Sequence, residues 1–137
     1  MNLALHAFEA RSATEIDKAS IRIAEQRAQA VLIFADPLMF SNVKKLAEVA
    51  MRHKFPAMFG FREFPEAGGL ISYLASAREQ YRLVASYVDK ILKGTDPGDL
   101  PIQQATRFEL IINLKTAKAL GLTVPAVLLV AADELIE

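Results

Sequence analysis

The feature of this sequence that most constrains its fold is a repeated switch between two hydrophobic periods. Short, continuous apolar runs such as residues 31–35 are typical of buried strands. Between such runs, apolar residues recur every three or four positions, as on one face of a helix. The longest helical stretch covers residues 77–92, and Gly94 follows it as a typical helix-terminating residue. This alternation predicts an α/β fold, with a three-layer parallel sheet flanked by helices and right-handed crossovers.

The same patterns predict the individual elements. Strands are expected at residues 2–8, 31–35, 56–60, 70–74 and 108–112, and helices at residues 12–29, 41–53, 77–92 and 113–120. Ser12 and Glu15 have the spacing of a capping box at the start of the first helix, and Asn113 is expected to cap the helix at residues 113–120. The run at 31–35 is expected to be covered on both faces of the sheet. Residues 61–69 are expected to form a loop, and Pro125 suits the first turn of a final helix.

Length, charge and residue content exclude several classes of function. A chain of 137 residues is expected to form a single domain, residues 1–137. Its 16 basic and 16 acidic residues give a net charge of zero, which argues against a nucleic-acid partner. Cysteine is absent, and His6 and His53 lie far apart, so we expect neither a metal site nor a cofactor. No nucleophile motif is present, so no catalytic residue is expected and the chain is not interpreted as an enzyme.

Targeting and membrane signals are not found in the sequence. The longest strongly apolar stretch, residues 124–132, contains Pro125 and falls short of the about 20 residues that a spanning helix needs. The first residues lack the basic region and the apolar core of a signal peptide. As written, the chain is expected to be cytoplasmic.

Two loops follow predicted strands at the edge where α/β sheets bind ligands, beyond the carboxyl ends of the strands. Asp36 lies in the first loop, where its carboxylate either accepts hydrogen bonds from a ligand or caps the next turn. Phe61, Arg62 and Glu63 lie in the second loop. Arg62 beside aromatic rings either clamps a ligand carboxylate or forms an ordinary surface ion pair. Tyr73, at the end of the next strand, faces a cleft or the core.

The pair Gly68-Gly69 lacks the spacing of a phosphate-binding loop and precedes a strand rather than a helix. We therefore interpret it as a tight turn.

Six blocks of the sequence, taken in order, resemble the family of ABC-transporter substrate-binding proteins. They are residues 35–40 (ADPLMF), 55–64 (FPAMFGFREF), 66–73 (EAGGLISY), 87–94 (YVDKILKG), 99–103 (DLPIQ) and 108–121 (FELIINLKTAKALG). The ordered set is specific and covers nearly the whole chain.

This resemblance implies one lobe of a type I periplasmic-binding-protein fold, in which two α/β lobes close on a small molecule. It implies non-catalytic binding of a small organic solute, such as an amino acid or an aromatic compound, and delivery to an ABC permease in the periplasm. Carried over by motif, the ligand-binding candidates are Asp36, Phe61, Arg62 and Tyr73, with Glu63 as a weaker one.

The departures from the family pattern matter as much as the match. Family members are more than twice as long, so this chain is expected to be truncated and to begin partway through the second lobe. The helix at residues 77–92 normally packs on the first lobe and here needs another partner. Exposed strand edges and apolar helix faces favour association. We therefore expect a homodimer or larger homo-oligomer, formed by exchange of this helix.

Two alternative functions remain open on the sequence. One is a free-standing cytosolic domain that senses a ligand or oligomerises. The other is a small enzyme on a flavodoxin-like layout, with Asp36 or Glu63 as acid–base. The enzyme alternative is disfavoured because the sequence lacks a nucleophile motif, a metal-ligand set and a phosphate loop.

Overall fold

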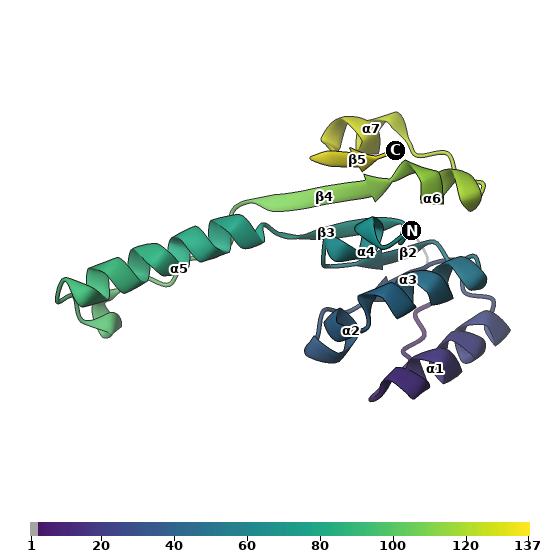
Figure 1. Ribbon diagram of the computed structural model, residues 1–137, viewed down its shortest axis with the longest axis horizontal. Coiled ribbons are helices and arrows are strands. Elements are labelled where there is room, and N and C mark those ends of the chain that lie inside the picture. The colour runs from purple at the N-terminus through teal and green to yellow at the C-terminus, as the bar shows by residue number, and fades with distance from the viewer. Residues whose placement is uncertain (1–2) are drawn as a thin grey trace. The chain divides into compact units, whose positions relative to one another are not determined.

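The computed structural model describes residues 3–137, which form a five-stranded sheet with flanking helices (Figure 1). In sheet order, the strands are β1 (Val31–Ile33), β2 (Ala57–Phe59), β3 (Ile71–Ala75), β4 (Phe108–Asn113) and β5 (Glu134–Ile136). The helices are α1 (Ala13–Glu25), α2 (Pro37–Ser41), α3 (Val43–Arg52), α4 (Glu63–Glu66), α5 (Ala77–Leu92), α6 (Leu114–Ala119) and α7 (Ala126–Ala131), with a 3-10 turn η1 (Pro97–Asp99). The predicted fold class, an α/β sheet flanked by helices, is confirmed.

The sheet is mostly parallel, with one antiparallel pair. Pairs β1–β2, β2–β3 and β4–β5 are parallel. Between β3 and β4, the Asn113 amide donates to the Leu70 carbonyl, and the Ser76 amide donates to the Arg107 carbonyl. Residue numbers therefore rise along β4 as they fall along β3, which is the antiparallel arrangement. As a result, the amino end of β5 lies at the same edge of the sheet as the carboxyl ends of β1, β2 and β3.

Helix α1 begins where the sequence predicts. The Ser12 side chain accepts a hydrogen bond from the Glu15 amide, and Glu15 in turn accepts one from the Arg11 amide at 2.7 Å. The helix ends at Glu25, short of the expected position 29, because Arg27 adopts a left-handed conformation with a φ of 53°. A left-handed residue just beyond the last turn terminates a helix in the same way as the more usual glycine.

The core lies where α1, α3 and α4 pack on β1 and β2. The Phe59 and Phe64 side chains are fully buried, with ring centroids 5.9 Å apart. Burying a side chain of this size stabilises the fold by about 1.5–3 kcal/mol. The other buried members of this core are Ile16, Leu46, Ala47, Ala50 and Ala57.

Gly68 and Gly69 form the predicted tight turn next to this core. Gly68 has a φ of +98°, which is favourable only for glycine. A Cβ at Gly69 would lie 2.4 Å from ring atoms of Phe64. The turn therefore needs both glycines, the first for its backbone angle and the second for close approach to the core.

The predicted strand at residues 2–8 is wrong for the part that the structure describes, since residue 2 lies outside it. Residues 3–8 have no regular secondary structure, and the Leu3 and Leu5 side chains are 68% and 90% exposed. The expectation that the run at 31–35 is covered on both faces is also wrong. β1 is an edge strand, and Leu32 on it is 59% exposed. Among residues 3–137, β1 is paired on one side alone, with β2, so neither segment gains the burial that its composition favours.

Three further elements differ from the sequence-based expectation. The segment at 61–69 contains the short helix α4, and β5 was not predicted. The helix expected at residues 41–53 is preceded by a separate short helix, α2. By contrast, Asn113 caps α6 as expected, since its side chain accepts a hydrogen bond from the Thr116 amide at 2.9 Å. None of the helices in residues 3–137 has both the length and the apolar character needed to cross a bilayer.

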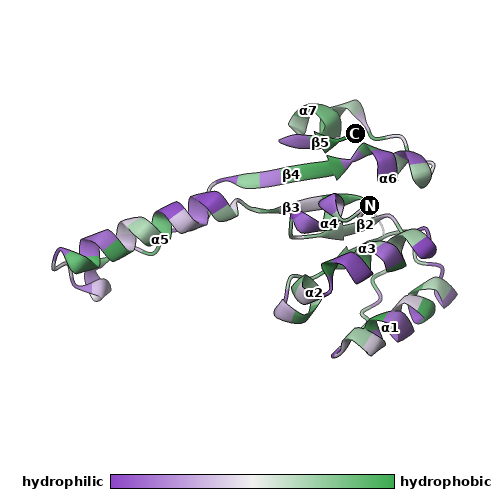
Figure 2. Cartoon of the chain, viewed as in Figure 1, coloured by the Kyte–Doolittle hydropathy of each residue, from purple (hydrophilic) through white to green (hydrophobic). Residues whose placement is uncertain are grey.

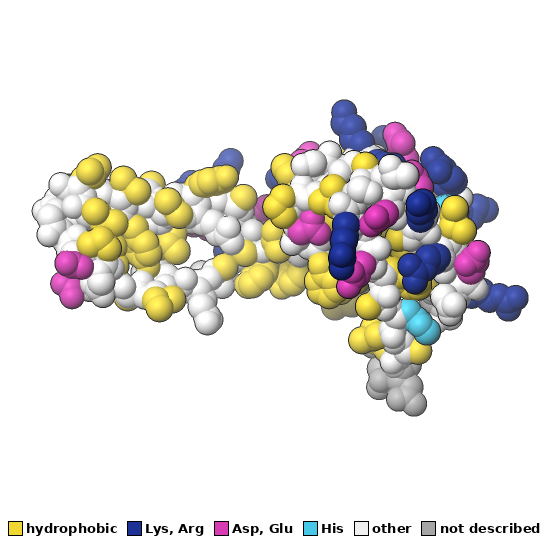
Figure 3. Space-filling model, turned by 90° about the horizontal axis from the view of Figure 1, so that it is seen from below, with side chains coloured by type: hydrophobic (Ala, Val, Ile, Leu, Met, Phe, Trp, Pro, Cys, Tyr) yellow, Lys and Arg dark blue, Asp and Glu magenta, His cyan; other side chains and the backbone are white. Residues whose placement is uncertain are grey.

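The chain divides into two compact units, one of residues 3–73 and 110–137 and the other of residues 74–109. The second unit contains α5, whose bounds and terminating Gly94 match the prediction. No residue of α5 is buried. Hydrophobic and hydrophilic residues alternate along it (Figure 2), and hydrophobic side chains gather on the surface of its unit (Figure 3). The exposed large apolar residues of the helix are Tyr81, Val84, Val88, Ile91 and Leu92.

Candidate functional site

The sheet register brings the sequence-predicted site residues to one edge. Ile33 of β1 lies opposite Phe59 of β2, and Phe59 lies opposite Ser72 of β3. Residues that closely follow these three positions therefore lie near the carboxyl ends of neighbouring parallel strands, where α/β sheets bind ligands. Asp36, residues 61–63 and Tyr73 all do so. We call this part of the molecule the carboxyl edge.

Asp36 caps the first helix after β1. Its Oδ1 accepts a hydrogen bond from the Met39 amide at 2.9 Å, and Pro37 occupies the first turn of α2. The capping interpretation of Asp36 is thus realised in the structure. The side chain is also exposed at the carboxyl edge, so ligand binding by the same carboxylate stays a prediction.

Aromatic rings connect the ends of β1 and β2. Phe40 of α2 lies edge-on to Phe61, with ring centroids 4.7 Å apart, and Phe61 lies 5.1 Å from Phe59. Phe40 is 43% exposed, whereas Phe59 is fully buried. Sequence reasoning missed Phe40 as a site residue, although it closes the same 35–40 block that contains Asp36. The pair of Phe40 and Phe61 gives this edge an aromatic surface anchored in the core.

Arg62 is held by two carboxylates. Its Nε donates to Glu66 Oε1 and its Nη2 donates to Glu134 Oε2, both at 2.9 Å. The hydrogen bond with Glu66 is the main cause that raises the pKa of Arg62; burial opposes the rise and Glu134 adds to it. A raised pKa keeps the guanidinium charged throughout the pH range in which the protein is handled. The ion-pair interpretation of Arg62 is realised, and Glu134 is a partner that sequence reasoning missed.

The remaining two candidates, Glu63 and Tyr73, lie on α4 and β3. Glu63 is half-buried and begins α4, directly after the Phe61-Arg62 turn. Tyr73 lies on β3 next to buried Ser72 and is 47% exposed. Their roles in ligand binding stay predictions.

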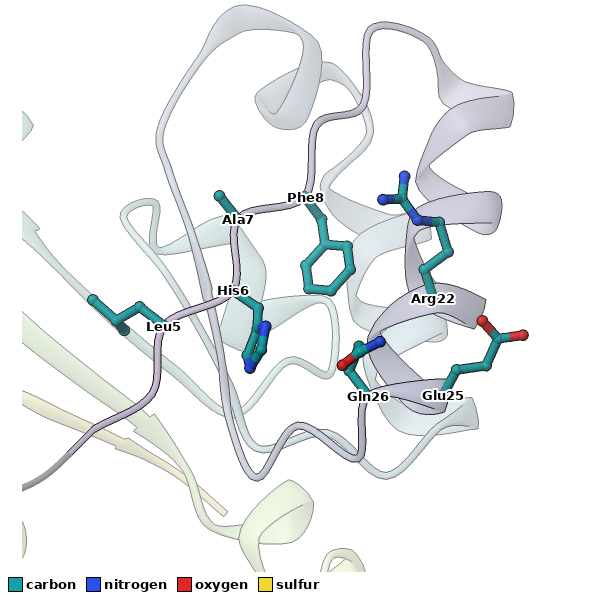
Figure 4. Close-up of a pocket in the computed structure, with 7 residues that line it drawn as sticks. All are labelled: Leu5, His6, Ala7, Phe8, Arg22, Glu25 and Gln26. Atoms are coloured by element: carbon teal, nitrogen blue, oxygen red, sulfur yellow. The ribbon is translucent and has the colours of Figure 1, made fainter.

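An open pocket of about 420 Å³ lies elsewhere, between the amino-terminal segment and the last turns of α1 (Figure 4). In it, the guanidinium carbon of Arg22 lies 5.4 Å from the centre of the Phe8 ring. None of the five candidate residues lines this pocket. The lining residues are Leu5, His6, Ala7, Phe8, Arg22, Glu25 and Gln26.

The side chains at the carboxyl edge suit the binding of a small molecule. Among residues 3–137, no three His, Asp or Glu side chains lie together as metal ligands would. Within the same range, every buried side-chain nitrogen or oxygen has a hydrogen-bond partner. The edge offers carboxylates, one paired guanidinium and aromatic faces, which suit hydrogen bonding to and stacking on a small molecule.

Comparison with known sequences decides the family. Residues 1–136 match the sequence model of the ABC transporter substrate binding proteins. The chain belongs to this family. The resemblance seen in the six sequence blocks is thereby confirmed for almost the full length. Among curated proteins, none matches this chain.

Solved structures of the same kind share the fold. A conserved domain protein from Vibrio cholerae is 27% identical with a TM-score of 0.82, over 92% of this chain and 42% of its own. An ABC domain in complex with L-Trp from Streptococcus pneumoniae is 24% identical with a TM-score of 0.88, over 98% of this chain and 45% of its own. A ligand-free, open substrate binding protein with adhesive properties from Clostridium difficile is 20% identical with a TM-score of 0.61, over 84% of this chain and 39% of its own. The chain therefore spans less than half the length of each of these structures.

Proposed function

We propose that this chain is the solute-recognition lobe of an ABC transport system and binds its ligand without catalysing a reaction. The observation that carries the proposal is the family match over residues 1–136, together with the convergence of candidate residues at the carboxyl edge. Asp36, Phe61, Arg62, Glu63 and Tyr73 form the proposed ligand-binding edge.

The proposed ligand is a small organic solute, such as an amino acid or an aromatic compound. The edge-on pair of Phe40 and Phe61 supplies a surface for an apolar or aromatic group, and neighbouring polar side chains supply hydrogen bonds. The L-Trp complex of the streptococcal ABC domain supports the same ligand class.

The family also supports the partners and location that we propose. The solute would be passed to a membrane permease, and recognition would take place in the periplasm. We further propose that residues 77–93 pack on a second lobe when one is present, because no residue of α5 is buried.

The exposed face of α5 supports an additional proposal, self-association into a homodimer or larger assembly. Tyr81, Val84, Val88 and Ile91 recur at helical spacing and are 40–76% exposed. An exposed apolar stripe of this kind gains free energy when a second copy covers it. This observation favours the alternative of a free-standing, oligomerising domain that senses a ligand.

A thermal-shift screen with amino acids, aromatic acids and other small organic solutes tests the binding function. A solute that binds the folded chain raises the melting temperature by mass action. We expect a shift that is lost in Asp36→Ala and in Arg62→Ala but is kept in the control variants Asp99→Ala and Arg82→Ala. A cooperative melt that no solute shifts would contradict the proposal.

A further inference from the structure

The partners of Arg62 bear on which solutes the carboxyl edge selects. Bidentate binding of a carboxylate uses two neighbouring nitrogens of the guanidinium, for example Nε and Nη2. In this structure Glu66 takes Nε and Glu134 takes Nη2, each at 2.9 Å. A ligand carboxylate therefore cannot use that side of Arg62 without displacing a carboxylate of the protein.

The position of Glu134 follows from the antiparallel pairing of β3 with β4. β4 and β5 run parallel, with Glu134 opposite Ile111, so β5 begins at the edge where β2 ends. Arg62 follows β2 directly, which places the two side chains within reach although 72 residues separate them. The contact is thus produced by the topology of the sheet, and it links α4 to the last strand of the unit.

Within residues 3–73 and 110–137, the charged side chains named at the carboxyl edge are mostly acidic. Arg62 is its positive member, whereas Asp36, Glu63, Glu66 and Glu134 are its negative members. The side chains in both ion pairs of Arg62 are 45–47% exposed, so a ligand that approaches the edge meets these charges directly. A carboxylate is repelled under these conditions, whereas an ammonium group is attracted. The exposed Phe40 ring next to Phe61 favours a cationic group in the same way.

We infer that Arg62 is a positioning residue, locked by Glu66 and Glu134, and that the carboxyl edge selects solutes by an ammonium or neutral donor group rather than by a carboxylate. The inference rests on the proposed solute-binding function of this edge. Glu134 is then a determinant of specificity, because its carboxylate both pairs with Arg62 and adds negative charge.

Two size-matched probes separate the possibilities. 2-Phenylethylamine carries an ammonium group without a carboxylate, and 3-phenylpropionate carries a carboxylate without an ammonium group. Dissociation constants are measured by calorimetry for the unaltered chain, for Glu134→Gln and for Glu66→Gln. Glu79→Gln is the matched control, since Glu79 pairs with Arg82 on α5 in the other unit.

We expect the amine to bind the unaltered chain at least about tenfold more tightly than the acid. Removing one carboxylate should reduce this preference by about three- to tenfold in Glu134→Gln and Glu66→Gln, as expected for one charge at contact distance near a surface. Glu79→Gln should keep the full preference. The ratio of the two dissociation constants is informative because a loss of fold would weaken the binding of both probes together.

Three results would count against the inference. Tighter binding of the acid than of the amine would overturn it and leave the solute-binding function intact. An unchanged preference in both glutamine variants, with cooperative melting, would remove Glu66 and Glu134 as determinants of specificity. Failure of both probes to bind a folded chain would contradict the inference, whereas the proposed function is decided separately by the thermal-shift screen.

Discussion

At the scale of single residues, this fold depends on side chains that satisfy backbone groups at the ends of short elements. Ser12, Asp36 and Asn113 each accept a hydrogen bond from an amide in the first turn of the helix that follows. Such caps act over three residues and are visible in the sequence, which is why Ser12 and Asn113 could be predicted. The partners of Arg62 could not all be predicted, because Glu134 is 72 positions away and is placed by the sheet.

Variants of Asp36 separate its capping role from its proposed binding role. Asp36→Ala should lower the free energy of unfolding by about 1 kcal/mol through loss of the cap of α2. Asp36→Asn keeps an oxygen that can accept from the Met39 amide, so its stability should stay close to that of the unaltered chain. If the carboxylate binds solute, Asp36→Asn should nonetheless lose the thermal shift. Chemical denaturation and the solute screen measure the two effects, and full solute binding by Asp36→Asn would exclude its charge from recognition.

Gly69→Ala should destabilise the fold by about 1–3 kcal/mol, because the added Cβ overlaps the buried Phe64 ring. Phe64→Leu removes Cε1, one of the three ring atoms that the new Cβ would overlap, and replaces the rigid ring by a branched chain that can change rotamer, so the double variant should lose less free energy than the sum of the two single variants. Gly68→Ala is the matched control. It introduces only backbone strain, since nothing lies within 4 Å of its Cβ, and Phe64→Leu should not rescue it. Additive losses for Gly69→Ala with Phe64→Leu, measured by denaturation, would show that the close approach is not the cause.

At the scale of elements, helices with a strong apolar period were predicted well, whereas the pairing of strands in the sheet was predicted poorly. α5 has the predicted bounds, because sixteen residues of regular apolar spacing and a terminating glycine specify a helix locally. Residues 3–8 and β1 have strand-like composition, yet the first is not a strand and the second is an exposed edge. Strand formation requires a paired neighbour, which composition alone does not supply.

The short strand β5 and the antiparallel pairing of β4 were missed for a related reason. β5 has only three residues, too few for a periodic signal, and the direction of β4 is set by its return from α5. An all-parallel sheet would have placed Glu134 at the opposite edge from Arg62. The candidate residues nevertheless lie at one edge as expected, because β1, β2 and β3 are parallel.

The link between α4 and β5 can be measured by a double-mutant cycle of Arg62→Met and Glu134→Gln. We expect a coupling free energy of about 0.2–1 kcal/mol, since both side chains are nearly half exposed and solvent screens their attraction. The coupling should fall as salt is raised toward 1 M. Because the pKa of Arg62 is raised above an already high value, raising the pH to 9 should leave the coupling unchanged. A coupling of zero at low salt would mean that Arg62 does not join the two elements.

At the scale of the whole molecule, the chain combines a sheet unit that has its own core with a unit whose helix has none. The first unit buries Phe59 and Phe64 completely, whereas every residue of α5 keeps contact with solvent. Exposed apolar surface of this kind is typical of a face that another chain or lobe covers. The chain belongs to the ABC transporter substrate binding proteins and spans less than half the length of the solved structures that it matches.

Self-association through α5 predicts a charge-sensitive oligomer. Val88→Glu places a carboxylate in the exposed stripe and should shift the chain toward the monomer. The monomer should still fold, because Val88 is already 48% exposed. Ser86→Glu adds the same charge on the opposite face of α5 and should leave the assembly intact. Sedimentation velocity across a dilution series measures both. A monomer at all concentrations of the unaltered chain would contradict the proposed oligomer.

The central claim is that solute binds at the carboxyl edge of β1, β2 and β3, and amide chemical-shift mapping tests it most directly. A ¹⁵N-labelled chain of 137 residues is titrated with the solute that gives the largest thermal shift. We predict that the amides of Asp36, of residues 38–40 and 60–63 and of Tyr73 move together and saturate with one dissociation constant. Shifts confined to residues 5–8 and 22–26, around the pocket beside α1, would contradict the claim and place the binding site there instead.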